Sequence, residues 1–532
     1  MKKLKISVAI LLILAMMVPL AACNNNGAQT STPPGGSSTQ PSGDPGSNAS
    51  TQPGTSTRDT LVIGLEGEPS SFVPWIAADP TSDAFISNVY DPLVRRNNQG
   101  QIVPSLAESW TLADDKMSFD FKIRQGVKFH NGYDLTADDV VFSVYQASIA
   151  PAKSFFGAIC AEVEKIDETT VRIHMAYPEQ AFLQYLARIT AIGSKQYYDE
   201  VGEATFAAEP VGTGAYKLVD WQKGYKILLE SYDDYFMGPA PIKNIEIQII
   251  MDSNTRLAAL ETGQVDLIYS PTGLQKEQIL KNSALGYSEQ QGEIFSYIGF
   301  NVTRPPFDNV KVRRALAMSV NRDDIITGAF DGLAYPLRVY LAPQTQGNPG
   351  EDTLDLLPFD IERAKAELVD AGFPNGLDIT FSCTEGSRKV ATILQDQWKQ
   401  IGVNCSVNIV EGGAIMSDIR NGVLDCFYFG GMDQTNDATI LLDFLTEKGI
   451  GILNNFMYIN PRYDELFEKQ TLEWDPVKRK EIVKEMLNIY AQDVPLIPTH
   501  LLISNMAYNK DLNIMIDTSF LGVMFREFSW KS

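Results

Sequence analysis

The sequence is poor in the residues on which enzymes and metal sites depend. Among its 532 residues there are three histidines, His130, His174 and His500, and five cysteines without Cys-x-x-Cys spacing. There is no Gly-x-Ser-x-Gly nucleophile motif and no His-Glu-x-x-His zinc motif. We therefore expect a protein that is not an enzyme and that has no cofactor and no metal site. A secreted hydrolase is a distant alternative.

Positive charge is also scarce. The chain has 44 lysines and arginines against 66 acidic residues, a formal net charge of −22. This balance argues against nucleic acid as a partner, because phosphate backbones bind basic surfaces. Four cysteines follow Cys23 and mostly lie in apolar, strand-like stretches: Cys160, Cys383, Cys405 and Cys426. We expect them to be reduced core residues, although a disulfide is possible.

The N-terminal apolar stretch, residues 6–20, is short for a membrane-spanning helix and follows three lysines. It is typical of a signal peptide covering residues 1–22. The sequence Leu-Ala-Ala-Cys that ends at Cys23 resembles a lipobox, which predicts cleavage before Cys23 and its acylation, including palmitate. Residues 23–58 are rich in Asn, Gly, Ser, Thr and Pro, which predicts a disordered tether. The tether is similar to those of Gram-positive lipoproteins; in a Gram-negative cell the protein would face the periplasm.

The stretch from residue 104 to 145 carries the strongest local patterns. Residues 118–124 alternate apolar and polar side chains, which indicates a half-buried strand. The pattern resumes at 127–129 and ends in a His-Asn-Gly turn at 130–132. Thr136 and Asp139 have the spacing of a capping box, which begins a helix. We therefore expect the order strand, turn, strand, helix.

This stretch, with AESW, a D-D pair, FKIRxGVKFHxG and LTADDVVFS, closely resembles the signature of extracellular solute-binding proteins of family 5. These are the oligopeptide-, dipeptide- and nickel-binding proteins of ABC importers. The PVGTGAY sequence at 210–216 and ALETGQVD at 259–266 also resemble this family. The resemblance implies an α/β, two-lobe, periplasmic-binding-protein-like fold of type II, in the large variant with an extra subdomain. From residue 365 to 409, expected helices alternate with expected strands, and glycines end the helices. This pattern independently favours an α/β second lobe.

The resemblance also implies the domain boundaries. We expect lobe I, with the extra subdomain, at 59–296, lobe II at 297–498, and a return to lobe I at 499–532. A short strand at 297–301 is the first crossing between the lobes, and residues 494–498 form the second. The cleft between the lobes is where such proteins hold their ligands.

Candidate ligand-binding residues follow from the same resemblance. Peptide-binding members have a Trp-x-x-Asp segment whose aspartate pairs with the peptide amino terminus. Here Asp433 matches the aspartate, whereas the tryptophan position is Gly430. We expect the Asp433 carboxylate to lie in water when the cleft is open. Arg388 resembles the arginine that receives a ligand carboxylate in dipeptide binders. Further candidates are Ser71, in a loop similar to the first ligand-facing loop, and Trp75, Tyr297 and Asn301.

The function implied is that of a monomeric, lipid-anchored, extracytoplasmic receptor. It would capture a small solute, above all a peptide, by hinge closure and deliver it to ABC permease subunits with their ATPases. Other solutes remain open within this fold, namely an oligosaccharide, a nickel complex or a haem complex. Presentation of the ligand to a sensor instead of a permease also remains open.

Overall fold

The computed structural model describes residues 58–77, 79–97, 100–433, 435–514 and 524–531. The expected signal peptide, Cys23 and the tether up to residue 57 lie outside the described residues. Within the described ranges, no helix is both long enough and apolar enough to cross a membrane.

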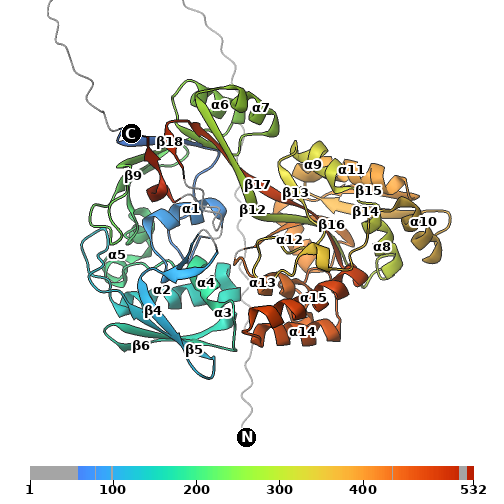
Figure 1. Cartoon of the computed structure of the whole chain (residues 1–532), viewed down its shortest axis with the longest axis horizontal. Helices are drawn as coiled ribbons and strands as arrows, with labels where there is room; N and C mark the ends of the chain where they lie inside the picture. Colours follow the sequence, from blue (N-terminus) through green and yellow to red (C-terminus); the bar gives the residue numbers. More distant parts are fainter. Residues whose placement is uncertain (1–57, 78, 98–99, 434, 515–523, 532) are drawn as a thin grey trace, which may run out of the picture. The chain divides into compact units, whose positions relative to one another are not determined.

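One sheet of eleven strands provides the framework, in the order β15-β14-β16-β12-β17-β11-β1-β10-β9-β8, with β13 paired to β17 (Figure 1). Its strands are β1 (Thr60–Leu65), β8 (Tyr216–Gln222), β9 (Lys226–Ser231), β10 (Asn244–Ile249), β11 (Leu267–Tyr269), β12 (Leu285–Phe300), β13 (Ala334–Pro336), β14 (Leu377–Cys383), β15 (Val403–Ile409), β16 (Cys426–Met432) and β17 (Leu496–Asn509). In this sheet, strands β1 and β8 to β11 belong to lobe I, and strands β13 to β16 belong to lobe II.

Lobe I adds helices and three small sheets to its part of the large sheet. The helices are α1 (Pro80–Val89), α2 (Ala137–Ile149), α3 (Ser154–Ile159), α4 (Phe182–Ile189), α5 (Lys195–Ala208), α6 (Ser253–Glu261) and α7 (Gly273–Lys281). The small sheets are β2 (Val94–Arg96) with β3 (Ile102–Pro104); β4 (Ala107–Leu112), β5 (Ser118–Ile123), β7 (Thr170–Met175) and β6 (Cys160–Asp167) in that order; and β18 (Leu512–Asn513) with β19 (Ser529–Trp530). The four-stranded sheet is the core of the extra subdomain.

The local patterns around residue 120 are largely confirmed. Phe119, Phe121 and Ile123 of β5 are buried, and Thr136 and Asp139 form the expected capping box of α2. Residues 127–129 are not a regular strand, so that part of the prediction is wrong. The expected turn at 130–132 is present: Gly132 has a φ of +89°, the Phe129 N–H donates to the Tyr133 carbonyl at 2.8 Å, and Lys128 makes an isolated antiparallel bridge to Asp134. Both edges of β5 are already paired, with β4 and β7, so residues 127–129 cannot pair with β5.

Lobe II has the expected α/β character. Its helices are α8 (Val310–Met318), α9 (Arg322–Phe330), α10 (Ile361–Asp370), α11 (Arg388–Lys399), α12 (Gly412–Arg420), α13 (Ala438–Leu442), α14 (Pro461–Leu472) and α15 (Pro476–Asp493). Strands β14 and β15 pair in parallel from Leu377 and Val403 onward, with α11 between them in the chain.

The cysteines Cys160, Cys383, Cys405 and Cys426 are buried and free, as expected for reduced core residues.

Two long strands connect the lobes and confirm the two-lobe fold. Strand β12 has 16 residues and β17 has 14, and they pair antiparallel along most of their length. The register shifts between Gln291 and Phe295 and again between Ser296 and Tyr297. The short strand expected at 297–301 is therefore the end of a longer one. Its first half is polar, and its strand conformation depends on pairing with β17.

Candidate functional site

A buried acidic residue, Asp433, lies directly after β16, where lobe II meets the connecting strands. Its backbone N–H donates to the Glu293 carbonyl at 2.9 Å. Its Oδ2 accepts from the Thr345 hydroxyl at 2.7 Å, and its Oδ1 accepts from the Asn436 N–H at 2.8 Å. The residue is only 3% exposed, so the Asp433 carboxylate is held by a rigid set of donors.

Burial raises the pKa of Asp433 to about 6, with the nearby Glu293 charge acting in the same direction. The Thr345 hydrogen bond and the Arg96 charge act in the opposite direction. The expectation of a solvated carboxylate is thus not met in this structure. A carboxylate has about four acceptor positions. Asp433 also accepts from the Thr435 N–H at 3.3 Å, so about one position remains for a ligand.

Lobe I places two arginines against this acidic pair. Arg188, on α4, donates from Nη1 to Glu293 Oε2 at 2.9 Å and from Nη2 to Asp83 Oδ2 at 3.2 Å. Its Nη2 also lies 3.5 Å from Met432 Sδ, next to Asp433. Arg96, on β2, is 3.9 Å from the other oxygen of Glu293. One largely buried cluster therefore joins Arg96, Arg188 and Asp83 of lobe I, Glu293 of the connecting strand β12 and Asp433 of lobe II, and we name it the interlobe cluster.

Two further contacts join the lobes. The Gln346 side chain, in lobe II, donates to the Gly100 carbonyl of lobe I at 2.9 Å. In lobe I, burial raises the pKa of Glu179 to about 8, and this carboxyl lies within the electrostatic range of Asp437 and Arg479 of lobe II. Arg479 and Asp437 are themselves a buried ion pair. The lobes are thus in polar contact in this structure.

Three other candidate residues lie in the cores of the lobes. Trp75 is 5% exposed and stacks on Phe206. Tyr297 is 1% exposed and packs edge-on against Phe456. The Asn301 amide donates to the Gly422 carbonyl at 3.2 Å. Their contacts hold the fold together, and the structure does not bring them to the interlobe cluster.

Ser71 and Arg388 lie elsewhere. Ser71 accepts from the Val73 N–H at 3.0 Å and lines a hollow of about 870 Å³ in lobe I. Arg388 makes two 2.7 Å hydrogen bonds to Glu385, and its side chain is 55% exposed. Of the six candidate ligand-binding residues, only Asp433 belongs to the interlobe cluster.

The sequence interpretation missed the basic half of the cluster. Arg96 and Arg188 are far apart in the chain, and no local motif marks either of them. The three histidines contact Gly214, Glu164 and Thr499, respectively. In the part of the chain that the structure describes, no group of three or more His, Cys, Asp or Glu side chains is arranged to hold a metal ion.

Comparisons with known proteins bear on the family and the fold. Residues 101–451 match the model of the bacterial extracellular solute-binding proteins, family 5 Middle. Heme-binding protein A of Haemophilus influenzae is 30% identical over 488 residues, which are 85% of this chain and 89% of that protein. HbpA2 from Haemophilus parasuis has a TM-score of 0.79 at 26% identity, covering 89% of this chain and 100% of that one.

A second solved structure is the periplasmic binding protein DppA from Helicobacter pylori in complex with the peptide STSA. It has a TM-score of 0.76 at 26% identity and covers 89% of this chain and 98% of that one. The family model spans more than half of the chain, and the Haemophilus influenzae relative covers most of it. The chain therefore belongs to the bacterial extracellular solute-binding proteins of family 5, the substrate-binding components of ABC importers.

Proposed function

We propose that this protein captures peptides outside the cytoplasm, binds their amino terminus at Asp433 and delivers them unchanged to an ABC permease. The observation that carries the proposal is the buried, pre-oriented Asp433 carboxylate at the contact between the lobes. A relative of the same fold was solved with a peptide, which supports the ligand class.

The physical basis is a charge-assisted hydrogen bond in a water-poor site. An ammonium paired with a carboxylate there contributes about 1.5–3 kcal/mol. The neighbouring Glu293 adds negative potential. At Gly430 an added Cβ would lie 3.2 Å from the Phe295 carbonyl oxygen. An aromatic side chain at this position would therefore require a backbone adjustment. Because the residue is glycine, no side chain at this position packs against the ligand.

Binding of tripeptides tests the proposal directly. We expect Asp433→Asn to weaken binding of Ala-Xaa-Ala tripeptides, with Xaa varied over the twenty amino acids, by about ten-fold or more, since 1.4 kcal/mol is one decade. N-acetylated versions should bind the wild type weakly and should be insensitive to the substitution. Native mass spectrometry and competition binding measure both effects.

The control is Asp396→Asn, which removes an exposed carboxylate on α11 and should leave binding unchanged. Equal affinity of the wild type for free and N-acetylated peptides would contradict the proposal. Recovery of a chemically altered peptide, in proportion to the amount of protein, would contradict a role limited to binding.

We also propose that Cys23 is the first residue of the mature protein and carries the lipid anchor. The lipobox-like sequence and the polar tether after it support this assignment. Two or three acyl chains hold a protein durably at a membrane, because each buried CH₂ contributes about 0.8 kcal/mol. Cys23→Ser should appear in the medium or persist as an uncleaved precursor. A processed Cys23→Ser protein that stays on the membrane, detected by fractionation and intact-mass measurement, would be inconsistent with this anchor.

A further inference from the structure

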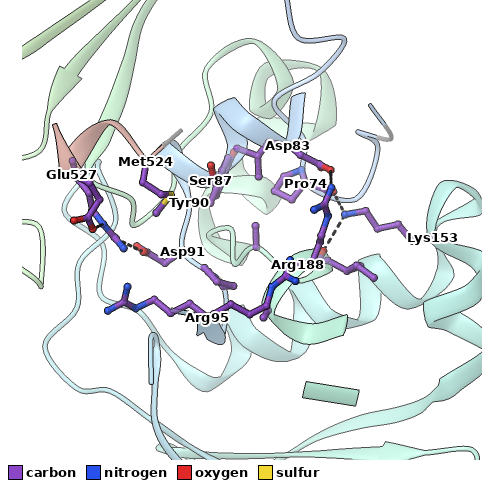
Figure 2. A pocket seen from close by; sticks show the side chains of 17 residues that line it. Pro74, Asp83, Ser87, Tyr90, Asp91, Arg95, Lys153, Arg188, Met524 and Glu527 are labelled. Atoms are coloured by element: carbon purple, nitrogen blue, oxygen red, sulfur yellow. Dashed lines mark hydrogen bonds and ion pairs between the residues drawn. The ribbon is translucent and has the colours of Figure 1, made fainter. Parts of the chain in front are cut away.

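Lobe I contains a charged cavity of about 90 Å³ beside the interlobe cluster (Figure 2). Five cationic side chains line it: Arg95, Arg96, Lys153, Arg188 and Arg526. Only three acidic side chains accompany them: Asp83, Asp91 and Glu527. In a chain whose net charge is −22, this excess of positive charge favours an anion. We name this cavity the lobe I cation pocket.

The acids of the pocket already have partners. Asp83 is paired with Arg188 at 3.2 Å. Asp91 accepts hydrogen bonds from the Thr213 and Tyr235 hydroxyls at 3.0 and 2.9 Å. Glu527 is 3.2 Å from Arg526. These pairs account for Arg188 and Arg526, and Arg96 lies 3.9 Å from Glu293. Among the described residues, no carboxylate lies within ion-pair distance of the other two cations, Lys153 and Arg95.

Lys153 is a buried cation held by neutral groups. It is 8% exposed, and its Nζ donates to the backbone carbonyls of Ile189, at 3.0 Å, and Pro74. Burial and the Arg188 charge lower the pKa of Lys153 to about 8, and the charge of Asp83 only partly offsets this. A buried ammonium in this setting gains from a nearby anion, because the pocket screens charge much less than water does.

Arg95 extends along the pocket from β2, as the labelled side chain in Figure 2 shows. Its Nε is buried and has no hydrogen-bond partner among the described residues. A guanidinium is planar and presents two parallel donors, which suits a carboxylate. The volume of the pocket is enough for one such group and a few waters, and too small for a whole peptide.

We propose that the lobe I cation pocket binds a carboxylate of the ligand whose amino group is held by Asp433. The inference rests on the proposed function and adds the acid anchor to it. Arg188 lines the pocket and also contacts Met432 next to Asp433, so the two anchors are adjacent and lie on different lobes. A ligand that engages both stabilises the closed arrangement. Arg388, which is paired with Glu385 on the surface, is then not the carboxylate receptor.

Amidated peptides test the acid anchor. The probes are Ala-Xaa-Ala tripeptides with a free carboxyl end, and C-terminally amidated tripeptides in which Xaa is Glu or Gln. We expect the amidated Gln peptide, which has no carboxylate, to bind the wild type about ten-fold more weakly than the free-acid peptides. The amidated Glu peptide keeps only a side-chain carboxylate, so its affinity shows whether a side-chain or a terminal carboxylate occupies the pocket.

The variants Arg95→Gln and Lys153→Gln should reduce this acid preference to about three-fold or less. The matched control Arg363→Gln removes an exposed arginine on α10 of lobe II and should preserve the preference. Arg95 is only partly buried, so Arg95→Gln decides the matter if Lys153→Gln does not fold. An unchanged acid preference in folded Arg95→Gln would overturn the inference.

The outcomes for the two anchors are separable. Equal binding of acid and amide, with a preserved preference for the free amino end, rejects the acid anchor and keeps the proposed function. If a carboxylate strengthens binding but neither N-acetylation of the peptide nor Asp433→Asn weakens it, the proposed amino anchor is rejected, and so is a ligand that engages both groups. Absence of binding of every tripeptide to protein freed of co-purified ligand contradicts both proposals.

Discussion

The Asp433 carboxylate is kept from water by groups of lobe II and by Glu293, and this burial has a cost. An unfolded aspartate titrates near 3.9, whereas the pKa of Asp433 in the folded protein is raised to about 6. Between these values the native state binds more protons than the unfolded state. The contribution of this group to the free energy of unfolding therefore falls as pH rises from about 4 to about 6.

Asp433→Asn should accordingly stabilise the empty protein at neutral pH. The amide stays uncharged, can accept from the Asn436 N–H and can donate to the Thr345 hydroxyl. We expect a higher melting temperature than the wild type at pH 7.5, with a gain of up to about 3 kcal/mol for two pKa units, and little difference near pH 4. Thermal unfolding at both pH values measures this. A solvated Asp433 would show no pH-dependent difference, and a less stable variant at pH 7.5 would be contrary to this argument.

At the scale of elements, the Pro-Val-Gly-Thr-Gly turn after α5 is explained by close packing. The Gly214 N–H donates to the Val89 carbonyl at 2.9 Å, and a Cβ on Gly212 would lie 2.0 Å from that same carbonyl oxygen. Neither glycine has a positive φ. The glycines therefore allow this turn to approach the end of α1 closely.

Gly212→Ala should destabilise lobe I by about 3 kcal/mol, because the added methyl group meets backbone atoms that cannot rotate away. Urea unfolding gives the free-energy difference. Gly67→Ala is the matched control, since a Cβ there meets nothing within 4 Å and the residue has no positive φ. If the two variants are equally stable, the packing explanation of the turn is wrong.

The sequence predicted those elements whose signal is local. The alternation in β5 and the capping box of α2 are contained within a few residues. Strand β12 was predicted as only a short piece, because its polar first half gains its hydrogen bonds from β17, some 200 residues away.

The candidate site was predictable only through the family motif. That motif points to Asp433, but Arg188, Arg96 and Lys153 come from three elements that are brought together only by the fold. Candidates such as Trp75 and Tyr297 were selected by residue type and segment, and the structure packs both into cores. Long-range pairing thus determines which side chains meet in the interlobe cluster.

At the scale of the whole molecule, the two lobes are connected covalently through β12 and β17, and polar contacts between the lobes add to these connections. The bond from Gln346 to the Gly100 carbonyl is one of them. Lys448 of lobe II also lies 5.8 Å from the centre of the Tyr177 ring of lobe I. Such contacts exist only while the lobes are together, so they set the balance between open and closed forms independently of the ligand's chemistry.

Gln346→Ala should therefore weaken binding without changing specificity. A net hydrogen bond contributes about 1 kcal/mol, which is about a five-fold change in an equilibrium constant. If the empty protein is mostly open, the apparent dissociation constant rises by this same factor for every ligand, through faster dissociation.

Gln278→Ala, which removes a hydrogen bond between Gln278 and Glu261 within lobe I, should have no such effect. Competition binding with free, N-acetylated and amidated tripeptides measures the factor, and small-angle scattering measures closure. A loss confined to one class of peptide would show that Gln346 contacts the ligand instead of holding the lobes together.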